Sequence, residues 1–139
     1  MLFLAFLIFS PADFVQADEL KEFTTDGCSL FPDGAVADRD LWLDCCIDHD
    51  YAYWQGGTRD RKKAADDRLE QCVADLGYGR TAFLMRQAVR FGGLPYWPTW
   101  FRWGYGWEYM RGFKPLTEEE KEQVIEKGGG YYKRTQKID

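Results

Sequence analysis

Two adjacent cysteines, Cys45 and Cys46, constrain the fold of this chain more than any other feature. The remaining cysteines are Cys28 and Cys72, and an even count of four indicates two disulfides if a chain of this size is exported, as the amino-terminal segment described next indicates. Neighbouring side chains on a helix point about 100° apart, so we expect no bond between Cys45 and Cys46. Each of the two then bonds to Cys28 or to Cys72, and both of these pairings remain open.

The amino-terminal segment has the pattern of a signal peptide. Residues 1–9 form a short apolar run, and Val15-Gln16-Ala17 supplies the small-x-small pattern that a signal peptidase needs. The run is shorter than the roughly 20 apolar residues that span a bilayer, so a permanent anchor is the weaker interpretation. We therefore expect a signal peptide over residues 1–17, export to the medium or the periplasm, and a single domain over 18–139.

Hydrophobic periodicity predicts a mainly helical, all-α domain. Between residues 38 and 55 the apolar and half-buried types recur at steps of three and four, which indicates an amphipathic helix. Thr58 can cap a second helix that runs to about Leu76 and pairs antiparallel with the first. A third helix is expected over 81–91. The stripe expected to be buried on the second helix consists of Ala65, Leu69, Val73 and Leu76.

Beyond this two-helix core, residues 24–76, the chain has an aromatic extension over 81–113 and a carboxy-terminal helix and tail over 117–139. The tail begins with a capping box, Thr117 with Glu120. The extension holds Trp97, Trp100, Trp103 and Trp107. Such rings favour the membrane-water boundary, but a small domain also needs apolar cover for its core. We expect most of them to pack on the core and a minority to be exposed.

The charge balance narrows the possible partners. The formal net charge is −5, which argues against nucleic acid because phosphate-backbone binding needs a basic surface. Neutral and zwitterionic substrates stay open, and no stable protein partner is implied. We expect the charged run over residues 59–63 to form the solvated face of the second helix.

His49 is the only histidine, and acidic residues surround it. Asp50 follows it directly, and Asp66 and Asp67 form an acidic pair on the expected second helix. Asp66 points within about 80° of the apolar stripe of that helix, whereas Asp67 points roughly 140° to 200° away. Asp66 is therefore expected to face His49, with Tyr53 as a further hydrogen-bond partner, and Asp67 to be solvated. An imidazole among carboxylates suits a general base.

The segment from Cys45 to Tyr53, with His49 and Asp50 at its centre, resembles the active-site helix of the secreted phospholipase A2 superfamily. The five fixed positions of the family pattern are present: two cysteines, then His-Asp after two residues, then a tyrosine after two more. The spacing of Asp66 and Cys72 is similar to that of the family's second helix. Asp26-Gly27-Cys28-Ser29 resembles the start of its calcium loop.

The resemblance implies a phospholipase A2-like fold and calcium-dependent hydrolysis of a phospholipid acyl ester at a membrane or micelle interface. The implied catalytic residues are His49 as the general base, Asp66 as its orienting partner, and Tyr53. The implied Ca²⁺ ligands are Asp50 and the backbone at Gly27 and Ser29. The implied disulfides are Cys28 with Cys46 and Cys45 with Cys72.

The chain departs from the family in the calcium loop, where a glycine-rich run is replaced by residues 29–34, and Asp33 is an alternative ligand there. Two other interpretations follow. One is an exported binding module that keeps the scaffold without activity. The other is a zinc domain in which Cys28, Cys72 and the Cys-Cys-x-x-His segment supply the ligands.

Overall fold

The computed structural model describes residues 18–131 and contains four helices and no strand within that range. The helices are α1 (Leu43–Gln55), α2 (Arg59–Asp75), α3 (Gly79–Gly92) and α4 (Glu118–Lys127). The expected signal peptide, residues 1–17, and residues 132–139 of the expected tail lie outside the described residues. The all-α class expected from the sequence is confirmed for the part of the chain described.

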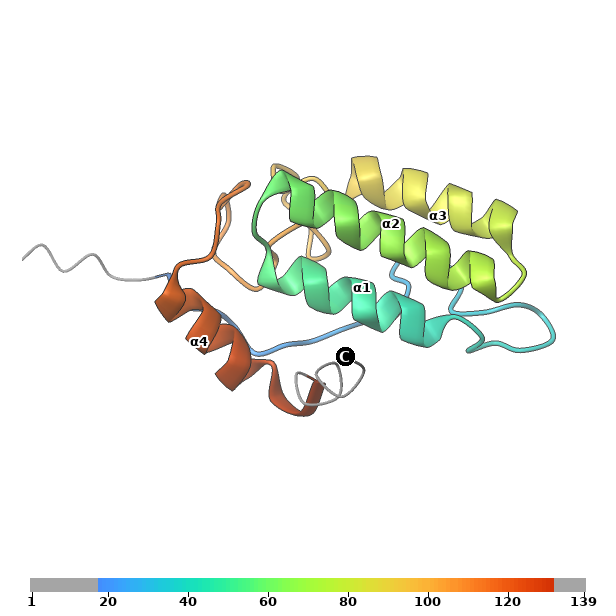
Figure 1. The fold of residues 1–139 in the computed structure, drawn as a ribbon, viewed down its shortest axis with the longest axis horizontal. Coiled ribbons are helices and arrows are strands. Elements are labelled where there is room, and N and C mark those ends of the chain that lie inside the picture. The colour runs from blue at the N-terminus through green and yellow to red at the C-terminus, as the bar shows by residue number, and fades with distance from the viewer. Residues whose placement is uncertain (1–17, 132–139) are drawn as a thin grey trace, which may run out of the picture.

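Helices α1, α2 and α3 lie side by side, and α1 and α2 run antiparallel as expected (Figure 1). Thr58 caps α2 by accepting a hydrogen bond from the amide of Arg61, and the capping box of Thr117 and Glu120 begins α4. Helix α4 lies outside this group, beside the amino-terminal segment that begins at residue 18 (Figure 1), and contacts α1 through Val124. The capping signals in the sequence therefore placed the starts of two helices.

Two sequence predictions about helix limits are wrong. The first helix begins at Leu43 instead of Asp38, because the preceding residues form turns in which the amide of Leu43 bonds to the carbonyl of Asp40. Leu76 is 41% exposed because it caps the end of α2 and lies beyond its last buried turn. The rest of the expected stripe, Ala65, Leu69 and Val73, is buried.

The two disulfides join Cys28 to Cys46 and Cys45 to Cys72. This is the pairing that the resemblance implied, and it decides between the two left open by geometry. One bond fixes the loop before α1 onto that helix, and the other clamps α1 to α2. Such bonds form in oxidising compartments.

Within residues 18–131, no helix has the length and apolar content that crossing a bilayer requires.

Helix α1 is buried on more than one side. Its Cys45 and Cys46 join Leu69, Val73 and Met85 in a core around the disulfides. On another side, Tyr51 and Trp54 pack with Leu20, Trp107 and Val124. The helix that carries His49 is therefore held by α2, by the aromatic extension and by α4, which gives its polar side chains fixed positions.

Candidate functional site

The histidine and the predicted aspartate meet between α1 and α2. The Nε2 atom of His49 lies 3.0 Å from Oδ1 of Asp66, and both residues are buried. Because a carboxylate only accepts, Nε2 carries the proton and Nδ1 keeps its lone pair. Burial lowers the pKa of His49 and outweighs the opposing effect of Asp66. The imidazole is thus held neutral, as a general base must be.

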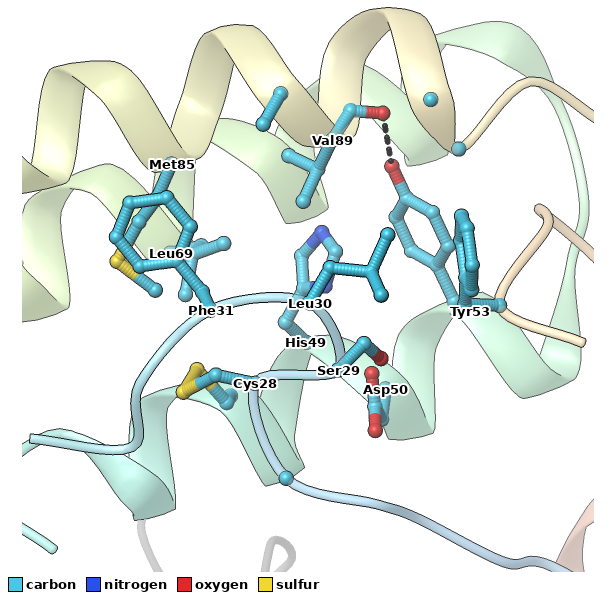
Figure 2. A pocket seen from close by; sticks show the side chains of 16 residues that line it. Cys28, Ser29, Leu30, Phe31, His49, Asp50, Tyr53, Leu69, Met85 and Val89 are labelled. Carbon is cyan, nitrogen blue, oxygen red and sulfur yellow. Dashed lines mark hydrogen bonds between the residues drawn. A yellow bond between two sulfur atoms is a disulfide. The ribbon is translucent and has the colours of Figure 1, made fainter.

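The third predicted member, Tyr53, lies one turn after His49. Its hydroxyl donates to Oδ1 of Asp66 at 2.6 Å and also lies 3.1 Å from the carbonyl oxygen of Val89, a contact drawn in Figure 2. The expectation that His49 and Tyr53 share Asp66 as a partner is confirmed.

Asp67 points away from this group, as the helical spacing predicted. It is half exposed and forms ion pairs with Lys63 and Arg86, at 2.6 Å to each. The sequence therefore distinguished the inward carboxylate of the pair from the outward one.

The expectation that residues 59–63 form a solvated face is wrong for Lys62. Its side chain is buried, and its Nζ lies 2.8 Å from Oδ2 of Asp66. Burial raises the pKa of Asp66, but hydrogen bonds from His49, Lys62 and Tyr53 outweigh burial and leave that pKa below its usual value. Asp66 therefore stays ionised beside the imidazole.

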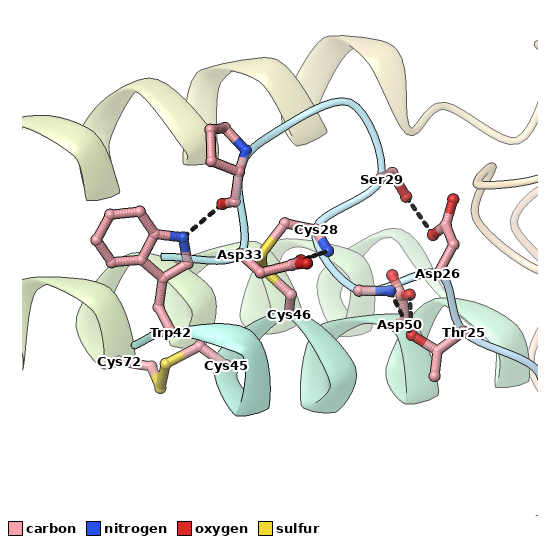
Figure 3. Close-up of a disulfide and its surroundings, with 12 residues drawn as sticks. Thr25, Asp26, Cys28, Ser29, Asp33, Trp42, Cys45, Cys46, Asp50 and Cys72 are labelled. Carbon is pink, nitrogen blue, oxygen red and sulfur yellow. Dashed lines mark hydrogen bonds between the residues drawn. A yellow bond between two sulfur atoms is a disulfide. The ribbon is translucent and has the colours of Figure 1, made fainter. Parts of the chain in front are cut away.

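Asp50, the predicted metal ligand, points from α1 toward the loop that precedes the helix. Its Oδ2 accepts a hydrogen bond from the hydroxyl of Thr25 at 2.6 Å (Figure 3). Burial raises the pKa of Asp50 to about 7, and the charges of Asp26 and Asp33 add to this rise, whereas the bond from Thr25 opposes it. The ionised form of the Asp50 carboxyl group is thus disfavoured in this environment.

The loop over Asp50 has a defined shape. Gly27 and Ser29 both have left-handed backbone angles, with φ of +74° and +53°. A Cβ atom on Gly27 would lie 2.5 Å from Oδ1 of Asp33, so this turn requires glycine. That same oxygen accepts from the amide of Cys28 at 2.8 Å, and Ser29 Oγ donates to Asp26 Oδ1 at 2.7 Å (Figure 3). The Asp33 oxygen therefore braces the loop backbone.

The structure brings all three predicted metal-site residues, Gly27, Ser29 and Asp50, to the lining of one cavity together with His49. Among residues 18–131 no group of three or more His, Cys, Asp or Glu side chains could hold a metal ion. A cation at this place would thus have fewer than three such side chains as ligands and would need other oxygen ligands, such as main-chain carbonyls. The zinc site considered above needs free thiolates from the cysteines. All four cysteines form disulfides, so this interpretation is wrong.

The cavity has a volume of about 170 Å³ and combines a small polar end with apolar walls. His49 and Asp50 lie at the polar end, and the walls come from the loop, from α2 and from α3 (Figure 2). The apolar side chains that line it include Leu30, Phe31, Leu69, Met85, Val89 and Phe101. A ligand with a hydrocarbon chain and a polar group next to that chain matches this distribution.

The aromatic extension divides between core and surface. Trp103 and Trp107 are buried, and their indole N–H groups donate to the carbonyls of Gly57 and Gln55 near the end of α1. Trp97 and Trp100 are about half to two thirds exposed, at 52% and 65%. The four tryptophans of the extension are thus evenly split, and Phe91 and Tyr96 are exposed as well, so the expectation that most of these rings pack on the core is wrong.

Three residues of the site were not anticipated from the sequence. Lys62 precedes Asp66 by four residues, and this spacing on one helix face could have indicated the pair. The other two are Thr25, which is hydrogen-bonded to Asp50, and Trp100, whose indole donates to Asp26 Oδ2 at 3.1 Å. Both lie in loops, which carry no such periodic signal.

Comparison of the chain with protein-family models, with curated proteins and with solved structures gave no match in any of the three.

Proposed function

We propose that this protein is an exported phospholipase A2-type hydrolase that cleaves a phospholipid acyl ester in the presence of calcium. The observation that carries the proposal is the neutral His49, held by Asp66 and adjacent to Asp50, at the polar end of an apolar cavity. With an acyl chain in the apolar part, the ester of the substrate would lie near this base, which supports the proposal.

The chain's own residues account for the proton transfers. His49 Nδ1 takes a proton from a water molecule as the water oxygen bonds to the ester carbonyl carbon. Asp66 balances the positive charge that forms on the imidazole, and Tyr53 keeps the carboxylate in place. His49 then gives the proton to the alcohol oxygen as the ester bond breaks, which releases a fatty acid and a lysophospholipid. No covalent intermediate on the protein is needed.

The donor chemistry at Asp50 fits Ca²⁺, a hard cation that prefers oxygen ligands. Asp50 and the backbone at Gly27 and Ser29 would hold the ion. The negative charges of Asp26 and Asp33, which disfavour ionised Asp50, would favour a cation there. When bound, calcium supplies polarisation of the ester carbonyl and stabilisation of the oxyanion.

The surface near the cavity supports a lipid substrate. Leu30, which lines the cavity, is 79% exposed, and Trp100 contacts the same loop through Asp26. Large apolar side chains that face water near a cavity are typical of surfaces that meet a membrane or another apolar partner. We propose that these side chains contact the interface from which the phospholipid enters.

Export is part of the proposal. It is supported by the two disulfides and by the signal-peptide pattern of residues 1–17 in the sequence. The phospholipase A2-like fold is also proposed, on the basis of the antiparallel α1 and α2, the disulfide between them and the loop bonded to α1.

Purified, oxidised protein mixed with phospholipid vesicles tests this function. Fatty acid release is expected to depend on calcium at about 0.1 to 1 mM, the range of extracellular calcium sites. His49→Gln should abolish release, and Asp50→Asn should abolish both release and its calcium dependence. Binding to vesicles without release at any calcium concentration would support the silent binding module in place of the enzyme.

A further inference from the structure

Lys62 lies in an unusual position for a lysine. It is 4% exposed, on the inward face of α2, one turn before Asp66. Its Nζ lies 2.8 Å from Asp66 Oδ2, 3.1 Å from the carbonyl oxygen of Val89 and 3.4 Å from that of Arg90. An ammonium group has three donors, so each of them has an acceptor here.

Burying an ammonium group is costly unless it is paired, so the position of Lys62 needs an explanation. Its charged partner is Asp66, and the ammonium also lies 5.1 Å from the centre of the Tyr53 ring. Both Tyr53 and Lys62 reach the carbonyl oxygen of Val89, which belongs to α3 and lines the cavity. The lysine therefore joins the carboxylate that holds His49 to the wall of the cavity.

The two oxygens of Asp66 have separate partners. Oδ2 takes the bond from Lys62, and Oδ1 takes those from His49 and Tyr53. A carboxylate held at one oxygen only can rotate about its last torsion, which is broad. We propose that Lys62 is a positioning residue that fixes the rotation of the Asp66 carboxylate, so that Oδ1 faces His49 Nε2 and His49 presents Nδ1 to the cavity. This role rests on the proposed function only in naming His49 as the base.

The same helix offers a matched control one residue away. Lys63 and Asp67 have the same four-residue spacing and a similar distance, 2.6 Å, but their side chains are 68% and 39% exposed. Lys63 and Asp67 thus form the same kind of ion pair at a solvent-exposed position, away from His49. Lys63→Met removes the same charge and functional group as Lys62→Met without touching the site.

The kinetic test compares these two variants in the calcium-dependent vesicle assay. Lys62→Met is expected to lower kcat by roughly 10- to 100-fold, the loss typical of a misplaced catalytic group, with KM nearly unchanged. Lys63→Met should keep both constants. In an Asp66→Asn background, Lys62→Met should cost little further activity, because the carboxylate that it positions is already gone. Equal losses in both backgrounds would contradict the proposal.

A second readout needs no turnover. His49 is the only histidine, so ¹⁵N NMR of the imidazole at neutral pH reports its tautomer alone. The wild type and Lys63→Met should show one tautomer with the proton on Nε2, and Lys62→Met should show a mixture. A single unchanged tautomer in Lys62→Met would overturn the proposal. If the wild type lacks activity but the tautomers change as expected, the proposed function fails and the role of Lys62 stands.

Removal of a buried lysine can also disturb folding. Lys62→Gln is the second variant, because it keeps an N–H donor for Asp66. Its kcat is expected to lie between the values of the wild type and Lys62→Met. If neither variant folds by circular dichroism, the proposal is wrong, because the lysine is then required for the fold itself.

Discussion

Replacing Asp50 with asparagine is expected to stabilise the calcium-free protein at neutral and alkaline pH. The carboxyl group is 9% exposed, and its pKa rises from 3.8 to about 7, first because of burial and then because of Asp26 and Asp33. The folded state thus holds this proton more tightly than the unfolded chain. The free energy of unfolding must therefore fall as pH rises from about 4 to about 7.

The magnitude follows from the same values. At about 1.4 kcal/mol per pKa unit, the rise corresponds to about 4 kcal/mol over that window, of which about 3 kcal/mol falls above pH 5. Asparagine has nearly the same shape as aspartate, can still accept the bond from Thr25 and does not ionise. The variant should therefore gain up to about 3 kcal/mol on the wild type between pH 5 and pH 8.

Urea unfolding in EDTA at pH 5 and pH 8, followed by tryptophan fluorescence, measures this difference. Asp44→Asn makes the same exchange at an exposed position of α1 and should leave the pH dependence unchanged. Calcium at pH 8 should raise the stability of the wild type and leave that of Asp50→Asn unchanged. If Asp50→Asn and the wild type lose stability equally from pH 5 to pH 8, burial does not raise the pKa of this carboxyl group and the prediction is wrong.

Three further changes have defined outcomes. Asp66→Asn should lower kcat by about 10² to 10⁴-fold, whereas Asp67→Asn should leave it unchanged in the vesicle assay; equal losses would contradict the assigned orientation. Replacing Cys45 and Cys72 with serine, which opens a loop with a sequence separation of 27, should lower the free energy of unfolding by about 3 to 4 kcal/mol in urea. The tryptophan fluorescence of the protein, to which exposed Trp97 and Trp100 contribute, should shift to the blue on adding vesicles, and an unchanged spectrum would count against their contact with lipid.

The parts of the site that lie on regular helices could be predicted from the sequence. Helical spacing alone placed Asp66 inward and Asp67 outward, because the direction of a side chain repeats every 3.6 residues. The geometry of adjacent cysteines excluded a bond between them, but both pairings to Cys28 and Cys72 satisfied it. Only the family resemblance favoured the pairing that is present.

The remaining features depend on contacts between segments far apart in the chain. Lys62 belongs to a charged run, and its burial follows from acceptors on α3 that the local pattern does not contain. The bond from Thr25 to Asp50 depends on how a loop without periodicity folds over α1. Trp103 and Trp107 are buried against the end of α1, whereas Trp97 and Trp100 are exposed. Composition could not separate the buried from the exposed rings.

We propose above that His49 acts as the base of a calcium-dependent phospholipid hydrolysis. The most direct measurement is fatty acid release from phospholipid vesicles by the oxidised protein, with calcium and with EDTA, for the wild type and for His49→Gln. We expect release by the wild type with calcium only, and none by the variant under either condition. No release by the folded wild type with calcium, or equal release by His49→Gln, would contradict it.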